Sequence, residues 1–176
     1  MNARSTFSTL SIAVVAATLA GCAGMSPGAG PTATAKLEAT RGNAATGTVT
    51  FSQQGDRVMV HARVEGLKPG QEHGFHVHEK GDCSSGDGMS TGGHFNPTGK
   101  PHGPQDADHH VGDLPALKAD ANGRADAQFH VTGVAIGSGV ADIVGKGLIV
   151  HAMPDDYRTQ PTGNAGGRIA CGVITR

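Results

Sequence analysis

Histidines are concentrated in one part of this chain, the stretch from His73 to Asp113. It holds seven of the ten histidines, together with many of the 28 glycines. A packed hydrophobic core has little use for this mixture, whereas a neutral imidazole is the commonest metal ligand among side chains. The stretch therefore predicts a metal site on a long ordered loop, with one strand leading into it.

Two spacings within this stretch suit metal ligands. His76 and His78 are separated by one residue in a strand-like pattern, so both imidazoles point to the same face. Three histidines and one carboxylate, a natural tetrahedral Zn²⁺ set, follow at His94, His102, His110 and Asp113. The alternative, a loop rich in histidine by chance, leaves a long structureless loop with nothing to order it.

The remaining histidines divide into two groups. His61 and His130 lie in segments of alternating polarity, and we interpret both as solvent-facing strand residues. His109 precedes His110, and only one of two neighbours normally faces a given ion. The periodicity of the sequence does not choose between these two.

Composition indicates the scaffold that must position these residues. The chain has 176 residues, no Trp and one Tyr, and its many glycines disfavour long helices. Period-two alternation with turn residues between segments predicts strands at 36–40, 46–53, 57–65 and 124–131. The strand that carries His76 at 73–79, a candidate at 114–118, a strongly apolar strand at 147–152 and a closing strand at 168–174 bring the total to about eight. Residues 140–144 fit either a helical turn or a short strand. The pattern predicts an all-β antiparallel sandwich or barrel with two long functional loops.

The N-terminus has the features of a targeting segment. Arg4 and a short apolar run predict a signal peptide over residues 1–21, and Leu19-Ala20-Gly21-Cys22 resembles a bacterial lipoprotein signal. We therefore expect lipidation of Cys22, a flexible tether over 22–34 and a folded domain over 35–176. The net charge of −1 and the absence of a basic run indicate no nucleic-acid partner.

Five motifs in order resemble the copper–zinc superoxide dismutase family, and the similarity spans roughly Lys36 to Thr175. They are Gly74-Phe75-His76-Val77-His78, Gly93-His94-Phe95-Asn96-Pro97, His110-Val111-Gly112-Asp113-Leu114, Val150-His151 and Asn164-Ala165-Gly166-Gly167-Arg168-Ile169-Ala170-Cys171-Gly172-Val173. The resemblance implies an eight-stranded Greek-key barrel. It also implies disproportionation of superoxide to O₂ and H₂O₂ by a copper ion cycling between Cu(II) and Cu(I).

The resemblance also implies roles for individual residues. One copper per subunit would be bound by His76, His78, His94 and His151. One zinc would be bound by His94, His102, His110 and Asp113, so that His94 bridges the two ions. Arg168 would bind the superoxide anion, and Asp155 would link the ligands His76 and His102. His73 would be structural.

Further expectations concern compartment and assembly. The resemblance implies a disulfide between Cys83 and Cys171, and Met153-Pro154-Asp155-Asp156-Tyr157 resembles the bacterial periplasmic branch. We therefore expect antioxidant defence at the cell envelope, in a periplasmic protein anchored to a membrane through Cys22. A monomer and a homodimer both fit the sequence. Lys80, Lys100 and Lys146 are candidates for steering the substrate.

Two other functions fit parts of the pattern. A copper-delivery lipoprotein would need no complete ligand set and no arginine beside it, whereas both are present here. A zinc hydrolase would need a general base, and no HExxH-like arrangement occurs in the sequence. The complete set of histidines, aspartate and arginine favours the dismutase.

Overall fold

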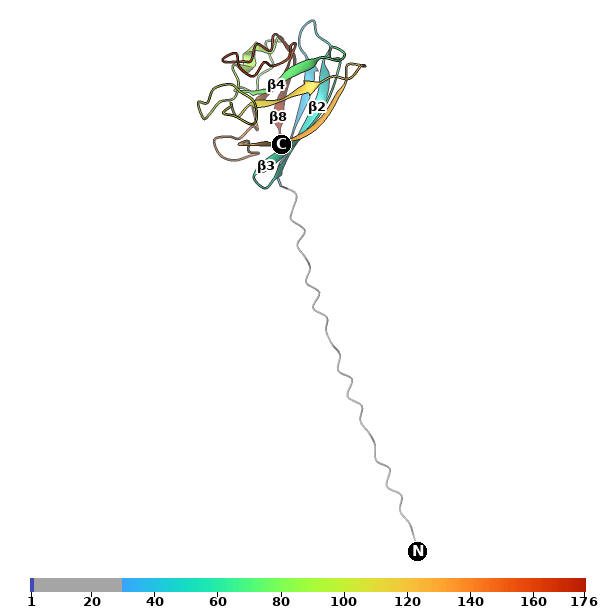
Figure 1. Ribbon diagram of the computed structural model, residues 1–176. Helices are drawn as coiled ribbons and strands as arrows, with labels where there is room; N and C mark the ends of the chain where they lie inside the picture. The colour runs from blue at the N-terminus through green and yellow to red at the C-terminus, as the bar shows by residue number, and fades with distance from the viewer. Residues whose placement is uncertain (2–29) are drawn as a thin grey trace.

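The computed structural model describes Met1 and residues 30–176, and these form an all-β domain (Figure 1). The eight strands are β1 (Thr32–Ala39), β2 (Thr46–Gln54), β3 (Arg57–Glu65), β4 (Glu72–His78), β5 (Asp113–Lys118), β6 (Ala125–Thr132), β7 (Gly147–His151) and β8 (Arg168–Thr175). Helical structure within residues 30–176 is limited to the single 3₁₀ turn η1 (Met89–Thr91), and no described helix is long and apolar enough to cross a membrane. The expected signal peptide, Cys22 and most of the expected tether lie outside the described residues.

All eight predicted strands are present, and the largest boundary error is at β1. The tether was predicted to extend to residue 34, whereas the strand begins at Thr32 and its register pairs Thr34 with both Thr50 of β2 and Thr175 of β8. The small residues Thr32-Ala33-Thr34 have the composition of a linker. Nevertheless, Ala33 and Ala35 are buried, so the segment already follows the period of a strand.

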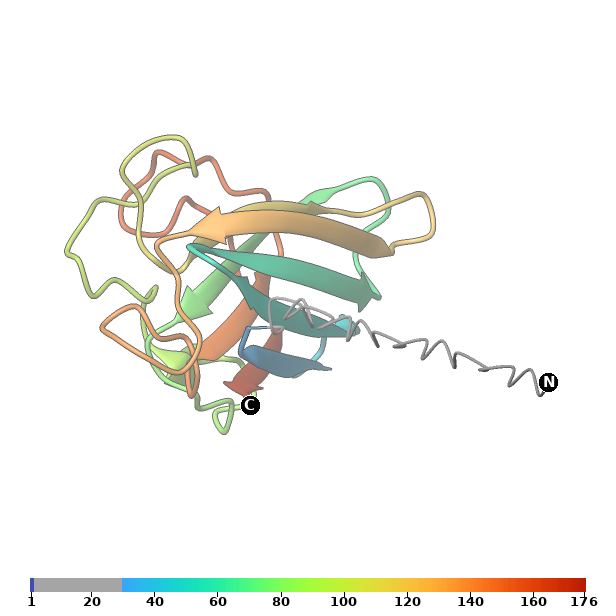
Figure 2. The same ribbon diagram turned by 90° about the horizontal axis from the view of Figure 1, so that it is seen from below.

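The strands form one antiparallel sheet in the order β5-β4-β7-β8-β1-β2-β3-β6, which curls into a nearly closed barrel (Figures 1 and 2). The connections β3–β4 and β6–β7 cross between strands that are not neighbours, as in a Greek key. Residues 140–144, within the second of these connections, are a turn followed by the isolated bridge Ala135–Asp142. They form neither the helical turn nor the strand that the sequence allowed.

The barrel interior is filled by the inward-facing half of each strand. Its large members are Leu37, Val49, Phe51, Val60, Phe75, Leu117, Leu148, Val150 and Ile174, all essentially inaccessible to solvent. Burying a side chain of this size contributes roughly 1.5–3 kcal/mol, so the frame is stabilised independently of any metal.

Strand β4 is buried on both faces, unlike β1 or β3. Phe75 and Val77 point into the barrel, while His76 and His78 point outward and are still fully buried. They are covered by the long loops 79–112 and 152–167, part of which run side by side outside the barrel (Figure 2). The histidines therefore lie between a rigid sheet and its loops.

Two features fix the loops on the sheet. A disulfide joins Cys83 of the first loop to Cys171 of β8, as the family resemblance implied. Gly74 provides the close approach of the second loop, because a Cβ at this position would lie 2.7 Å from Cβ of Ala165. Larger residues at Gly74 would push the second loop away from β4.

Candidate metal centre

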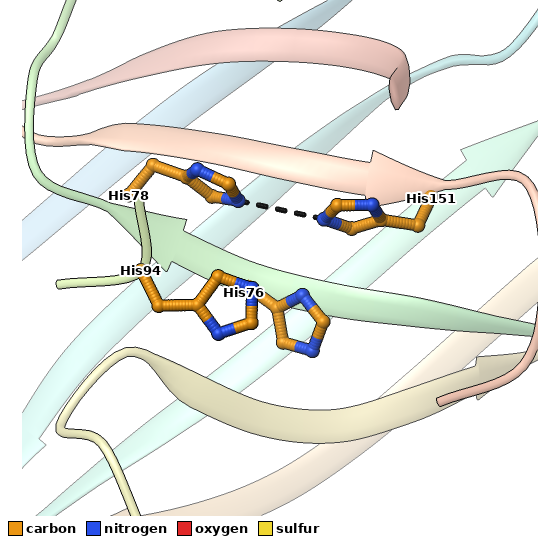
Figure 3. Close-up of side chains that lie close together, drawn as sticks. All are labelled: His76, His78, His94 and His151. Atoms are coloured by element: carbon orange, nitrogen blue, oxygen red, sulfur yellow. Dashed lines mark hydrogen bonds between the residues drawn. The ribbon is translucent and has the colours of Figure 1, made fainter. Parts of the chain in front are cut away.

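Four histidines converge on the outer face of β4 (Figure 3). His76 and His78 come from alternate positions of β4, His151 from the end of β7, and His94 from the first loop, where it forms an isolated bridge with His78. One ring nitrogen from each of the four lies within 4.8 Å of the others, and all four side chains are buried.

In His78 and His151, a hydrogen bond on the outer side of the ring leaves the inner nitrogen unprotonated, so that this nitrogen offers a lone pair. Nδ1 of His78 lies 2.9 Å from the carbonyl oxygen of Gly92, and Nδ1 of His151 lies 3.2 Å from that of Gly166. Each Nδ1 therefore carries the proton and donates it. The two Nε2 atoms face each other at 3.4 Å, the dashed contact in Figure 3, and two lone pairs at this distance suit a shared cation.

His76 is oriented in the opposite sense. Its Nε2 lies 2.6 Å from Oδ2 of Asp155, which accepts the ring proton. Its Nδ1 is buried, faces the other histidines and finds no hydrogen-bond partner among the described residues. An unpaired buried nitrogen costs free energy, and a bound metal ion removes that cost.

A second group, consisting of His94, His102, His110 and Asp113, adjoins the first and is also buried. The Asp113 carboxylate lies at its centre, 2.8 Å from Nδ1 of His94, 3.2 Å from Nδ1 of His110 and 2.9 Å from Nδ1 of His102. The His102 nitrogen nevertheless makes no hydrogen bond of acceptable angle. Atoms that are close but misaligned for hydrogen bonding fit ligands directed at a common ion.

His94 belongs to both groups. Its Nδ1 faces Asp113, whereas its Nε2 is buried without a partner among residues 30–176. The two nitrogens of one imidazole therefore serve two adjacent four-residue sets. One set contains only imidazoles, which suit copper and zinc alike, and the other adds a hard carboxylate, which favours zinc.

Asp155 connects the two groups from outside. Its Oδ2 accepts a hydrogen bond from His76, and its Oδ1 accepts one from Nε2 of His102 at 2.9 Å. The backbone N–H of Tyr157 also donates to Oδ1, at 2.7 Å. Carboxylates in this position fix the tautomer and the orientation of the ligating rings.

The electrostatics of the site keep three of its six imidazoles neutral. Burial lowers the pKa of His94 to about 4 and of His151 to about 3, and it lowers the pKa of His78 further. Burial alone would raise the pKa of Asp113, but the imidazoles of His102, His110 and His94 outweigh it and hold that pKa below its usual range. Burial alone would likewise lower the pKa of His102, but the carboxylates of Asp113 and Asp155 outweigh it and raise that pKa to about 9, so this ring releases a proton when it binds an ion.

These pKa values predict acid sensitivity of the metal-free protein. The unfolded chain binds protons at His78, His94 and His151 near pH 6.5, whereas the folded chain does not until pH 4 or lower. Lowering the pH from 6.5 to 4 should therefore decrease the free energy of unfolding. Denaturant titrations at several pH values would check this, and a flat profile would contradict it. Metal-loaded protein should show a steeper slope in this range, because bound ions keep every ligand unprotonated in the folded state while the unfolded chain takes up a proton at each histidine.

Arg168, at the start of β8, is held beside the all-histidine group. Its guanidinium donates to the carbonyl oxygens of Gly88 and Gly92 and to the hydroxyl of Thr91, each at 2.7 Å. The Gly92 carbonyl also accepts the hydrogen bond from His78. One backbone oxygen therefore fixes the distance between the arginine and a predicted copper ligand.

The sequence could not reveal this carbonyl cradle, because main-chain oxygens leave no signature in residue types. It did place the other histidines. His61 and His130 lie on the outer face of β3 and β6, where they contact Asp126 and Gln54. His109 is partly exposed and points to the Ala107 carbonyl, so His110 is the neighbour that enters the site.

The other predicted residues divide between structural contacts and the surface. His73 is buried but binds the carbonyl of His151, which fits its expected structural role. Lys100 pairs with Asp108, and Lys146 lies 4.7 Å from the ring centroid of Phe95. Neither contact places a lysine over the two groups of ligands.

Comparison with known proteins decides which family has this geometry. A sequence model described as copper/zinc superoxide dismutase matches residues 45–174. The chain belongs to the copper/zinc superoxide dismutase family. As a member of that family it is an enzyme that disproportionates superoxide, and its cofactors are copper and zinc.

Individual relatives agree with this membership. The chain is 48% identical over 137 residues to "Superoxide dismutase [Cu-Zn] 2" of Brassica juncea, covering 73% of this chain and 88% of the plant protein. Among solved structures, that of the clock protein EA4 has a TM-score of 0.74 at 41% identity, covering 82% of this chain and 93% of that one. A SOD-like protein from Bacillus subtilis has a TM-score of 0.72 at 35% identity, covering 80% and 96%. The dismutase fold thus extends over nearly the whole described domain.

Proposed function

We propose that the two adjacent groups are the copper and zinc sites of this dismutase. Copper is assigned to His76, His78, His94 and His151, and zinc to His94, His102, His110 and Asp113. The single observation that carries this assignment is His94, whose two nitrogens face different groups. Metal analysis together with activity in the purified protein tests it. Two metals per chain are expected, and inactive protein with both sites filled would overturn the assignment.

The protein's own residues have three tasks in the reaction. Copper supplies the one-electron redox chemistry when it is bound. Arg168 carries a permanent charge and a forked pair of donors, which suit a diatomic anion. Nε2 of His94 is the atom that takes up a proton and gives it to the departing product. Asp155 keeps the rings of His76 and His102 in the tautomers that leave their Nδ1 atoms free.

Arg168→Ala should slow turnover while both metals stay bound. The guanidinium attracts the substrate anion, and attraction of this kind raises association rates by roughly 10- to 1,000-fold. We expect at least about a tenfold loss at low salt, with a weaker dependence of the rate on salt than in the wild type. Pulse radiolysis at several ionic strengths measures both quantities.

The matched control for this variant is Arg63→Ala. Arg63 is an exposed residue of β3 that pairs with Asp126 of β6. The control variant should keep normal rates. If Arg168→Ala retained the wild-type rate at low salt, its assigned role would be wrong.

We further propose that the chain is a bacterial envelope lipoprotein of the periplasmic branch, anchored to a membrane through lipidated Cys22. The support is the signal-like sequence ending in Leu19-Ala20-Gly21-Cys22, with residues 1–21 removed and the residues from Cys22 to the start of β1 at Thr32 serving as the tether. Cys83 and Cys171 are bonded to each other, so Cys22 is the cysteine outside that bond. Labelling cells with a fatty-acid analogue should mark the wild type and not Cys22→Ser. An unlabelled wild type would rule out the anchor.

Assembly belongs to the same proposal. Family resemblance alone supports a homodimer, and nothing in the geometry of the metal groups requires a second chain. Sedimentation of the mature domain should give twice the mass of one chain. A single-chain mass would remove the dimer and leave the metal assignment unchanged.

A further inference from the structure

His102 has the least regular backbone surroundings among the predicted zinc ligands. It lies in loop 79–112, far from any strand. In the described part of the chain its main chain bonds to one residue, Gln160 of the second loop. The backbone N–H of His102 donates to Oε1 of Gln160 at 2.8 Å, and Nε2 of Gln160 donates to the carbonyl of His102 at 2.8 Å. The side-chain amide of Gln160 thus supplies the two main-chain hydrogen bonds that a neighbouring strand would otherwise make.

The same segment of the second loop also holds the ring of His102. Asp155 accepts the proton of its Nε2, and the ring of Tyr157 lies parallel to it, with a 2° interplanar angle and centroids 6.5 Å apart. Tyr157 has φ of 54°, a left-handed conformation that is unfavourable for an aromatic residue. Such outliers persist where the surrounding contacts determine them, and they are concentrated at functional sites.

The two loops approach too closely for this contact to be incidental. At Gly163, a Cβ would lie 2.5 Å from Nε2 of His102 and 1.9 Å from Oδ1 of Asp155. Gly163 also has φ of +66°, which a side chain would rarely adopt. Residues 155–163 are therefore fitted around His102 from several sides.

We propose that Gln160 is a positioning residue for the zinc site, which it serves by fixing the backbone of His102. The inference rests on the proposed assignment of His102 to zinc. Nδ1 of His102 lies 2.9 Å from the Asp113 carboxylate, and its place beside the other predicted zinc ligands depends on where the backbone is held. Without Gln160 the irregular backbone around His102 loses both of its hydrogen bonds. Zinc should then be bound less tightly, while the copper ligands on β4 and β7 stay in place.

Replacing Gln160 with methionine tests this idea cleanly. Gln160 is exposed, so the variant leaves no cavity; it removes the two hydrogen bonds to His102 and a longer one, of 3.3 Å, from Nε2 to the carbonyl of Arg158. Gln128→Met is the matched control, because Gln128 is also exposed and contacts His61 on the far strands. Outer contacts of metal ligands are typically worth 10- to 100-fold in affinity, so we expect zinc affinity to fall by about that factor.

The measurements separate positioning from general stability. Zinc affinity is determined by competition with a chelator, and hydrogen exchange of the His102 amide is followed in the metal-free protein. Gln160→Met should weaken zinc binding and accelerate that exchange, with the copper(II) spectrum and the thermal midpoint of the metal-free protein unchanged. If Gln160→Met does not fold, Gln160→Asn, whose amide is too short to reach, should give the same result.

Three outcomes would count against the inference in different ways. Zinc affinity equal to that of wild type and Gln128→Met would overturn the role of Gln160. A loss of zinc affinity accompanied by a lower thermal midpoint of the metal-free protein would show that Gln160 is only a structural residue, and would also overturn its proposed role. A wild-type protein that binds no zinc would instead refute the proposed zinc site.

Discussion

His151→Ala should reduce superoxide disproportionation to the background rate. The imidazole of His151 faces that of His78 across 3.4 Å and completes the all-histidine group, so its loss leaves three ligands and an enlarged opening. Loss of a residue that hydrogen-bonds to a metal ligand typically lowers metal affinity or activity roughly 10- to 100-fold. Removal of a ligand itself should therefore lower the activity by at least about 100-fold. Copper content and the rate measured by pulse radiolysis would check this.

The barrel itself should survive this substitution. His151 is the last residue of β7, and its neighbours Val150 and Leu148 continue to fill the core. The matched control is His130→Ala, which removes an exposed histidine of β6 outside both groups and should retain full activity. Normal copper content with normal rates in His151→Ala would refute the copper assignment.

Asp113→Ala should release zinc and loosen loop 79–112. The Asp113 carboxylate contacts three imidazoles and accepts the backbone N–H groups of Gly103 and His110 at 3.2 and 3.0 Å. Its loss therefore removes a ligand and leaves two buried donors unpaired, at a cost of about 1–3 kcal/mol each.

Zinc binding also stabilises the folded chain by mass action, by about 4 kcal/mol when free zinc is ~1,000 times its dissociation constant. Thermal unfolding with and without added zinc should show a large zinc-dependent rise in the midpoint for the wild type and little for Asp113→Ala. Asp126→Ala, which breaks the surface pair with His61, is the control and should respond to zinc as the wild type does. A full zinc response in Asp113→Ala would exclude this residue as a ligand.

The frame and its chemistry were predictable from the sequence to different extents. Alternation revealed the half-buried strands, because such a strand must place every second residue inward, as in Val58, Val60 and Ala62 of β3. Strand β7 is buried along its whole length, and its continuous apolar run predicted it instead. Alternation failed only where small residues hid the pattern, at Thr32 to Thr34. The spacing of His76 and His78 placed two rings on one face. His151, 73 residues further on, joined them in the prediction only through family resemblance.

Contacts between the loops could not be predicted. Gln160 binds His102 across 58 residues, and the carbonyl of Gly88 receives Arg168 across 80. Both are hydrogen bonds between a side chain and a main-chain group, so neither partner has a distinctive residue type. Only the folded geometry shows which glutamine or which carbonyl is within reach.

The two groups of ligands differ in the secondary structure from which their side chains come. His76, His78 and His151 come from strands whose inward neighbours pack the barrel, whereas His102 and His110 come from an irregular loop. As the sheet closes, the copper pocket takes its shape from the barrel's own packing. In the zinc pocket only Asp113, at the start of β5, has such support, and the rest of its shape depends on contacts between the two loops. During maturation, zinc uptake should therefore be the step that requires chain rearrangement, and copper can enter a cradle that already exists.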